Sequence, residues 1–197
     1  MNRFDIINLL IFKHKYDRYL EIGVEGGENF NAVRCAIKHG VDPFSVNATF
    51  RIPSDEFFNM LSYRIRYDLV FVDGMHTADQ AGRDIYNALE HLNPGGTIVV
   101  HDCNPPTEWH QRSFEEFLKH PNAWNGDVWK AIVELRATHP DLTVSVVDED
   151  WGCGIIQRGQ QETITLPKEE LTYAMLEANR KEWLNLITGE EFLRTYL

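Results

Sequence analysis

The 197-residue sequence has few cysteines, no long hydrophobic run and no cluster of basic residues. Its three cysteines, Cys35, Cys103 and Cys153, are too few and too scattered for a disulfide framework or a CxxC zinc site. We therefore expect a reducing, cytoplasmic environment. No apolar run approaches the ~20 residues that span a bilayer, so no membrane partner is expected. The early stretch "DIINLLIF" predicts an amphipathic first helix.

Acidic residues outnumber basic ones by 30 to 19, which gives a formal net charge of -11. A surface of this charge repels the phosphate backbone of nucleic acids. The composition therefore argues against a nucleic-acid partner and favours a small-molecule substrate.

Strand-like and helical runs alternate through the first 140 residues, which predicts an α/β fold: a mostly parallel sheet with helices on both faces. The expected strands are 19–24, 40–43, 48–54, 67–74 and 93–102, and the expected helices are 29–38, 54–60 (with Ser54 as N-cap), 77–92 and 127–136. Residues 142–159 predict a terminal hairpin that adds an antiparallel edge strand.

The whole chain, 1–197, is expected to form one domain with a core at about 16–160 and a helical extension at about 165–197. The helices of this extension are amphipathic. They either pack on the sheet or form a homo-oligomer with a second subunit.

Polar residues gather where the predicted strands end. They are Glu21–Gly27, Asp42, Asp73–His76 and Asp102–Asn104. Ligands of open parallel sheets bind at this edge, outside the carboxyl ends of the strands. The sequence therefore predicts a binding site there.

The first of these loops, "YLEIGVEGGENF", has the pattern acid-x-Gly-x-x-x-Gly at Glu21, Gly23 and Gly27. A dinucleotide fingerprint would need glycine where Glu25 stands, and no P-loop motif occurs. Asp42 follows about twenty residues after the first acid, the spacing of a ribose-binding carboxylate. An acidic loop without a phosphate cradle suits a cationic nucleoside such as S-adenosylmethionine.

Several motifs in this order resemble class I S-adenosylmethionine-dependent methyltransferases. They are "LEIGV", "GVDP", "SDEFF", "FVDGMH", "NPGGTIVVHDCNPPTEWHQ", "GDVWKAIVELR" and "DWGCGII". The resemblance covers about 16–160 and is strongest to a small bacterial group similar to metal-dependent sugar and catechol O-methyltransferases. It implies a Rossmann-like, seven-stranded sheet whose last strand is antiparallel.

The same resemblance implies roles for individual residues around the cofactor. Glu21, Gly23 and Gly27 would line the methionine part, and Asp42 would hold the ribose. The other implied cofactor contacts are Ser54 and Asp55 beside the adenine and Asp73 near the methyl group.

Asp73 and Asp102 end neighbouring predicted strands, so their carboxylates could lie close enough to share a proton or bind a cation. Oxygen ligands suit Mg²⁺ or another hard divalent ion, which lowers the pKa of a bound hydroxyl. Metal-dependent relatives usually have Asp or Asn where Cys103 stands, and Asn104 could substitute as the third ligand. The sequence leaves the need for a metal open.

His76 is the best candidate for a general base because it follows Asp73 by three residues. His101 is a weaker candidate, since side chains alternate along a strand and Asp102 must face the ligand. Asp84, one to two turns along the same helix, could face His76, but a solvent salt bridge with Arg83 or a neighbour is expected.

Aromatic residues in the irregular stretch after Asp102 predict a lid that includes Trp109 and Trp124, whereas Trp129 is expected in the core.

These features favour an enzyme that transfers a methyl group from S-adenosylmethionine to an oxygen, in preference to a nitrogen, of a small molecule such as a sugar or secondary metabolite. Two alternatives stay open. One is a non-catalytic S-adenosylmethionine-binding protein, and the other is a metal-dependent hydrolase or lyase that uses Asp73 and Asp102.

Overall fold

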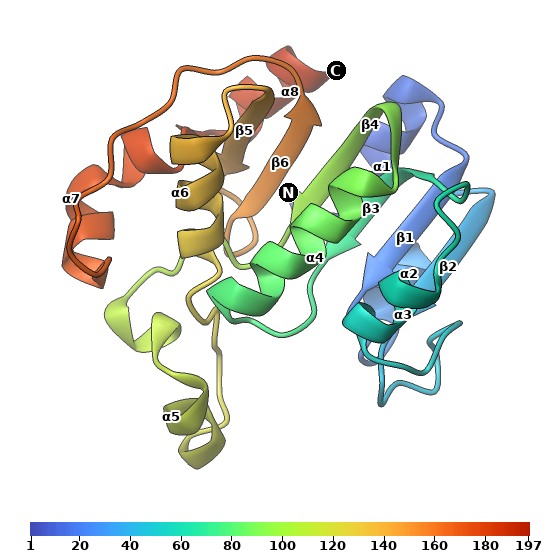
Figure 1. Ribbon diagram of the computed structural model, residues 1–197, viewed down its shortest axis with the longest axis horizontal. Helices are drawn as coiled ribbons and strands as arrows, with labels where there is room; N and C mark the ends of the chain where they lie inside the picture. Colours follow the sequence, from blue (N-terminus) through green and yellow to red (C-terminus); the bar gives the residue numbers. More distant parts are fainter.

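A computed structural model describes residues 1–197 as one seven-stranded sheet with helices on both faces (Figure 1). The strands are β1 (Arg18–Ile22), β2 (Ile37–Val41), β3 (Tyr67–Val72), β4 (Leu92–Val100), β5 (Leu142–Val147), β6 (Cys153–Arg158) and β7 (Leu186–Ile187). The helices are α1 (Arg3–His14), α2 (Glu28–Ala32), α3 (Ser54–Met60), α4 (Ala78–Glu90), α5 (Phe114–Lys119), α6 (Trp129–Thr138), α7 (Tyr173–Trp183) and α8 (Gly189–Tyr196), with a 3-10 turn, η1, at Glu108–Gln111. None of these helices is long and apolar enough to cross a membrane.

Two hydrophobic layers hold the helices to the sheet. From Leu69 to Val72 of β3 the side chains alternate between the layers. Val70 and Val72 pack with residues of α3, α4, α6 and α7, whereas Leu69 and Phe71 pack with residues of α1 and α8. In Figure 1, α4 and α6 lie in front of the sheet and α1 lies behind it. Burial on both faces explains why the strands read as continuous apolar runs. The predicted α/β architecture is confirmed.

The strand order is β2-β1-β3-β4-β6-β5-β7, and the antiparallel strand β6 lies inside the sheet between β4 and β5. The prediction of an antiparallel edge strand was therefore wrong. Residues Cys153–Ile156 are all buried, as expected for a strand that is paired on both sides. The edge is formed instead by β7, which runs parallel to β5.

Two expected elements in the first third of the chain differ from the structure. The helix expected at 29–38 ends at Ala32, where the Lys38 amine binds the carbonyls of Phe30 and Val33, and β2 follows. The strand expected at 48–54 is reduced to a single bridge between Val41 and Phe50.

The start of α3 and the end of the chain also refine the prediction. Pro53 caps α3 in place of Ser54, whose hydroxyl instead accepts a hydrogen bond from Gln80. The C-terminal segment forms α7 and α8 and packs on the sheet of its own chain, with Phe192 fully buried.

Candidate functional site

The glycine loop begins directly after β1, where Gly23 has a φ of 86°. A Cβ atom at this position would lie 2.0 Å from the carbonyl oxygen of Asp73. Any other residue would therefore push the β1 loop away from the loop that follows β3. Glycine is needed here because two backbones meet.

The Asp42 carboxylate accepts hydrogen bonds from four backbone amides. Its Oδ2 accepts hydrogen bonds from Val24 and Glu25 at 3.0 and 2.9 Å, and its Oδ1 accepts from Phe44 and Ser45 at 2.8 and 2.9 Å. Burial would raise the pKa of Asp42, but these four bonds lower it. The carboxylate ties the loop after β2 to the glycine loop, and its contact with a ribose stays a prediction.

Glu21 is 1% exposed and points from β1 into the site. Its Oε2 accepts hydrogen bonds from the Tyr19 hydroxyl and from the Asn29 amide, the latter at 2.8 Å. Burial raises the pKa of Glu21 to about 7. The acid therefore sits close to the midpoint of its titration at neutral pH, held by neutral donors.

Two cavities adjoin at this edge of the sheet. The cluster cavity, about 550 Å³, is lined by Arg3, Glu21, His101, Asp102 and Asp150, among other residues. The α4 cavity, about 560 Å³, is lined by residues that include Asp42, Ser54, Asp55, Gln80 and Asp84. Both cavities share Gly23, Glu25, Asp73, His76 and Trp124. A ligand that passes Gly23 can therefore occupy both.

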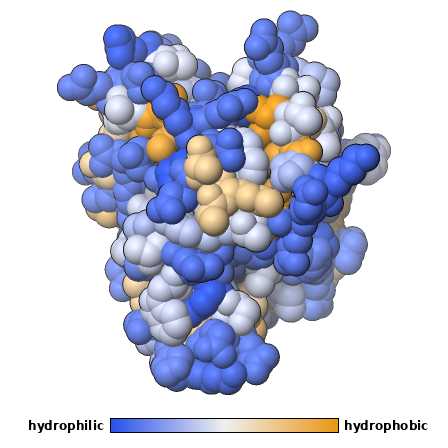
Figure 2. All heavy atoms as spheres, turned by 90° about the vertical axis from the view of Figure 1, so that its left-hand side faces the viewer, coloured by the Kyte–Doolittle hydropathy of each residue, from blue (hydrophilic) through white to orange (hydrophobic).

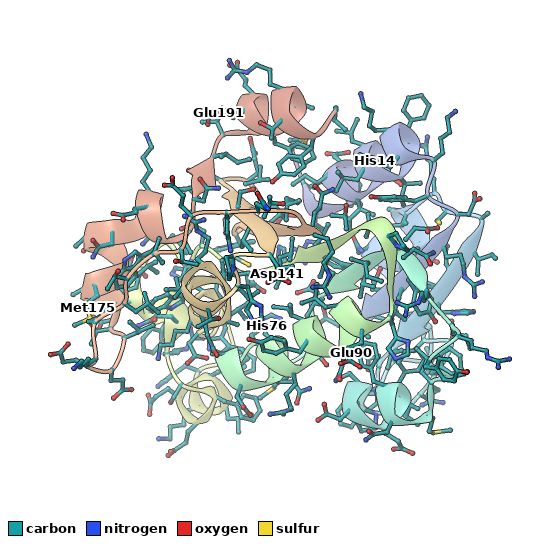
Figure 3. The ribbon with its side chains drawn as sticks, turned by 45° about the horizontal axis from the view of Figure 1, so that its top comes forward. His14, His76, Glu90, Asp141, Met175 and Glu191 are labelled. Atoms are coloured by element: carbon teal, nitrogen blue, oxygen red, sulfur yellow. The ribbon has the colours of Figure 1, made fainter.

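Asp73, His76 and Asp102 come together at the junction, as the sequence predicts. The His76 imidazole lies beside the start of α4 (Figure 3), with Nε2 3.5 Å from Asp73 and Nδ1 3.1 Å from Asp102. One potential ligand atom from each of the three residues lies within 4.8 Å of the others.

His101 also belongs to this cluster, contrary to the expectation that it faces away. Its Nδ1 lies 3.2 Å from Asp73 and 3.1 Å from Asp102, and its Nε2 lies 3.6 Å from Asp150. The alternation of side chains stops because β4 ends at Val100 and Asp102 adopts a left-handed φ of 61°. Both His101 and Asp102 can therefore face the site.

Arg3 and Asp150 complete the cluster. Asp150 begins the motif "DWGCGII", but no role in the site was predicted for it, and Arg3 lies in none of the motifs. Arg3, from α1, places Nη1 2.8 Å from Asp73 and Nε 3.0 Å from Asp150. Asp150 reaches inward from the β5–β6 turn, where its φ is 46°. Only the folded structure brings these two residues together, because they lie 147 positions apart in the sequence.

The cluster balances its own charge: three carboxylates face one guanidinium and two imidazoles. Burial alone would lower the pKa of His76, but Asp73 and Asp102 raise it to about 9. Burial would raise the pKa of Asp73, and the neighbouring histidines hold it well below its usual value. His76 is thus protonated at neutral pH in this arrangement. Its role as a general base stays a prediction that requires the loss of this proton.

Asn104 lies outside the cluster. Its amide nitrogen donates to Asp148 at 2.8 Å, and its oxygen accepts from Arg180. Asn125 stands near the position predicted for Asn104, with its Nδ2 2.8 Å from Asp102 Oδ1 and its own Oδ1 buried without a hydrogen-bond partner. Cys103 is fully buried, and burial raises its pKa well above the usual range, as expected for a packing residue.

Ser54 and Asp55 line the α4 cavity together with Asp84. The expected salt bridge between Asp84 and Arg83 does not form, because Arg83 pairs with Asp79 and Asp55 at the surface. Asp84 is 1% exposed, and burial raises its pKa to about 6.

Residues 26–103 match a family model described as a methyltransferase domain. None of the curated protein sequences matches the chain. The S-adenosylhomocysteine-bound methyltransferase PaMTH1 from Podospora anserina has a TM-score of 0.57 at 16% identity, over 80% of this chain and 78% of that chain. The O-methyltransferase TomG from Streptomyces achromogenes, in complex with S-adenosylmethionine, has a TM-score of 0.53 at 20% identity, over 78% and 77%. The O-methyltransferase from Bacillus cereus, in complex with S-adenosylhomocysteine, has a TM-score of 0.52 at 16% identity, over 78% of each chain.

The fold is the one seen in these three methyltransferases, so the predicted Rossmann-like fold and the resemblance to methyltransferases are confirmed. The matched residues 26–103 begin in the glycine loop and end just after Asp102. They therefore include the strand ends that carry Asp73 and Asp102, but not Arg3 or Asp150.

Within the methyltransferase fold, Asp73, His76 and Asp102 fit a divalent cation by the chemistry of their donor atoms. Arg3 binds Asp73 Oδ2, and Asn125 binds Asp102 Oδ1, so the other oxygen of each carboxylate faces His76. Such outer hydrogen bonds orient metal ligands. The donor set thus supports a metal, with Asn104 excluded from it by position.

The segment between β4 and α6 bears the aromatic residues predicted to form a lid. Trp124 lines both cavities and stacks on His76, with ring centroids 5.4 Å apart, whereas Trp109 is half exposed. In Figure 1, α5 extends away from the sheet, and Figure 2 shows mainly hydrophilic residues at this end of the molecule. Trp129 is fully buried, so its expected place in the core is confirmed.

Proposed function

We propose that this chain transfers a methyl group from S-adenosylmethionine to an oxygen of a small molecule. The close approach of Gly23 to Asp73 carries this proposal, because it joins the two cavities beside the Asp–His cluster. A cofactor that spans the junction has its nucleoside in the α4 cavity and its methionine part near Glu21.

The charges of the junction suit a cationic cofactor. Glu25 and Asp73 line the junction, Glu21 lines the cluster cavity next to it, and no phosphate-binding glycine motif is present. Asp42 holds the glycine loop in place, while Ser54 and Asp55 lie on the adenine side. Three relatives by fold, from Podospora anserina, Streptomyces achromogenes and Bacillus cereus, were solved with S-adenosylmethionine or S-adenosylhomocysteine, which supports the same cofactor here.

For the acceptor we propose a hydroxyl placed in the cluster cavity. Asp73 and Asp102 would hold Mg²⁺ or another divalent cation, which when bound would lower the pKa of a hydroxyl, and His76 would stay free to act as the base. Arg3 and Asn125 orient the two carboxylates. His76 accepts the hydroxyl proton once it has lost its own.

The acceptor class, the partners and the compartment are part of the same proposal. The net charge of -11 supports a small molecule such as a sugar or secondary metabolite, without nucleic acid. All three cysteines are free, which supports the cytoplasm. A homo-oligomer through α7 and α8 stays a prediction.

Ligand binding gives the direct test. S-adenosylhomocysteine at about 100 times its Kd should stabilise the protein by ~2.7 kcal/mol, a clear increase in Tm. An unchanged Tm across millimolar concentrations would sink the proposal. ATP serves as the control nucleotide, because its phosphates face Glu25 and Asp42 and should give no increase.

A second candidate is a non-catalytic protein that binds S-adenosylmethionine. It is supported by the charge balance of the cluster, in which His76 is protonated and cannot act as a base. This alternative predicts binding without turnover on any catechol or sugar, with or without Mg²⁺, and a His76→Ala variant that binds like the wild type. A metal-dependent hydrolase or lyase predicts instead that Asp42→Ala leaves activity intact.

A further inference from the structure

Asp84 is the one charged residue on the buried face of α4. Its neighbours on this face are Ala81, Ile85, Ala88 and Leu89. No Lys, Arg or His nitrogen lies within 4 Å of the Asp84 carboxylate, although it is 1% exposed and lines the α4 cavity. Aspartate is almost never fully buried without a partner. A buried carboxylate at a cavity wall without a cation therefore points to a ligand group as its partner.

The hydrogen bonds around Asp84 leave acceptors to spare. Asp84 Oδ1 lies 3.2 Å from Gln80 Nε2, and the same nitrogen lies 3.2 Å from Ser54 Oγ and 3.3 Å from Asp55 Oδ1. An amide nitrogen has only two hydrogens. The Ser54 hydroxyl also donates to Asp84, but an ionised carboxylate accepts several hydrogen bonds, so Asp84 can accept a further one.

Gly74 lies beside the second carboxylate oxygen of Asp84, and both residues line the α4 cavity. A Cβ atom built on Gly74 would stand 3.9 Å from Asp84 Oδ2. Gly74 directly follows Asp73, at the junction of the two cavities. A planar group that enters the α4 cavity from the junction can therefore approach Asp84.

A neutral group with N–H donors satisfies such a wall, whereas a carbonyl oxygen is repelled by it. Adenine carries an exocyclic amino group with two N–H donors, and hypoxanthine carries an oxygen at the same position. Resting on the proposed function, we propose that Asp84 accepts a hydrogen bond from the amino group of the cofactor's adenine and makes the α4 cavity selective for adenine over hypoxanthine.

A purely structural role for Asp84 makes a different prediction. Through Gln80, Asp84 also links α4 to Ser54 and Asp55 on α3. If this link were its only role, replacement would change stability and weaken all ligands alike. The ratio of the affinities for an adenine and a hypoxanthine compound distinguishes base recognition from a structural role, because a loss of stability alone weakens both compounds equally.

Isothermal titration of the full chain with S-adenosylhomocysteine and S-inosylhomocysteine tests the proposal. At pH 8 Asp84 is ionised, since its pKa is about 6. We expect the wild type to bind the adenine compound at least about tenfold more tightly, as for a hydrogen bond to a charged group. In Asp84→Asn the ratio should fall at least about tenfold, because the new amide can donate to the hypoxanthine oxygen.

Asp79→Asn is the matched control, since it removes a carboxylate from the same helix at an 84% exposed side chain outside both cavities. It should keep the wild-type ratio. Asp84→Ser serves in place of Asp84→Asn if the latter does not fold, and it should also lower the ratio.

Three results would overturn the proposal: equal affinities in the wild type, an unchanged ratio in the Asp84 variants, or a ratio lost in Asp55→Asn but kept in Asp84→Asn. A wild type that binds S-adenosylhomocysteine tightly with any of these ratios refutes only the role of Asp84. A wild type that binds neither compound refutes the proposed function as well.

Discussion

The two cavities bury carboxylates in opposite ways. In the cluster cavity, Asp73, Asp102 and Asp150 are each in contact with Arg3 or a histidine. In the α4 cavity, the hydrogen-bond donors to Asp84 are neutral and come from Gln80 and Ser54, and Arg83 acts on it only from beyond ion-pair distance. The same chemical group therefore has a lowered pKa at Asp73 and a raised one at Asp84.

This difference indicates what each cavity can receive. A cluster that is already neutral exchanges one cation for another, so protons and a divalent ion compete for the same oxygens. A lone buried carboxylate gains most from a neutral N–H donor, because such a donor adds a hydrogen bond without bringing a charge into the interior. Changes on either side of the junction test this contrast.

The largest effect is expected for Asp73→Ala, which removes the shared partner of Arg3, His76 and His101. Buried cations left without a partner should lower the free energy of unfolding by roughly 3–5 kcal/mol. Urea denaturation measures the loss. The control Asp141→Ala breaks a pair whose Asp141 side chain is 60% exposed and should cost at most about 1 kcal/mol. Equal losses for the two variants would contradict the charge balance of the cluster.

Gly23→Ala should break the junction itself. The added methyl group would overlap the Asp73 carbonyl, and alanine is strained at this positive φ, so we expect a loss of roughly 3 kcal/mol and weaker binding of S-adenosylhomocysteine. Gly95→Ala is the control, because Gly95 has a φ of 78° and a Cβ atom there would have nothing within 4 Å. Urea midpoints that match for both variants would show that backbone strain, and not the close contact, decides the effect.

Asp84→Asn should change how stability depends on pH. The pKa of Asp84 in the fold, about 6, lies above its ordinary value of 3.8, so the folded state holds the proton more tightly than the unfolded chain. Wild-type stability therefore loses on the order of 2 kcal/mol from this group as pH rises from about 4 to about 6. The variant lacks this loss. Urea unfolding of both proteins across this range measures it, and a constant difference would disprove the raised pKa.

The smallest effect is expected for Arg83→Ala. The Arg83 side chain is 45% exposed and pairs with Asp79 and Asp55, not with Asp84. We expect Tm to stay within about 2 °C of the wild type, as is usual for surface ion pairs. The stability loss between pH 4 and 6 should persist in this variant. If this pH-dependent loss were absent in Arg83→Ala, Asp84 would pair with Arg83 after all, as the sequence suggested.

Local sequence patterns were enough to predict most of the fold. Apolar runs located β1, β3 and β4, and the polar residues that follow them gave Glu21, Asp73 and Asp102. The order of β5 and β6 escaped prediction because a hairpin reads the same at an edge or inside a sheet. Strand pairing is a tertiary property that the local pattern does not contain.

The site was predicted in part for the same reason. His76 and Asp102 follow strands and could be placed at the edge, whereas Arg3, Asn125 and Asp150 reach the cluster from distant segments. The prediction for His101 failed because the rule of alternation was applied beyond the last residue of β4. The left-handed φ of Asp102 was not predicted, because residues other than glycine adopt this conformation only infrequently.

Arg3 has a consequence for the order in which the molecule assembles. Its side chain joins Asp73 and Asp150, which lie 70 and 147 positions away in the sequence. Contacts between such distant segments form late, since the entropy of closing long loops must be overcome first. Until α1 packs on the sheet, Asp73 and Asp150 lack the guanidinium of Arg3 between them and repel each other. In a refolding experiment followed by hydrogen exchange, the loops that carry Asp73 and Asp150 should therefore become protected after the central strands.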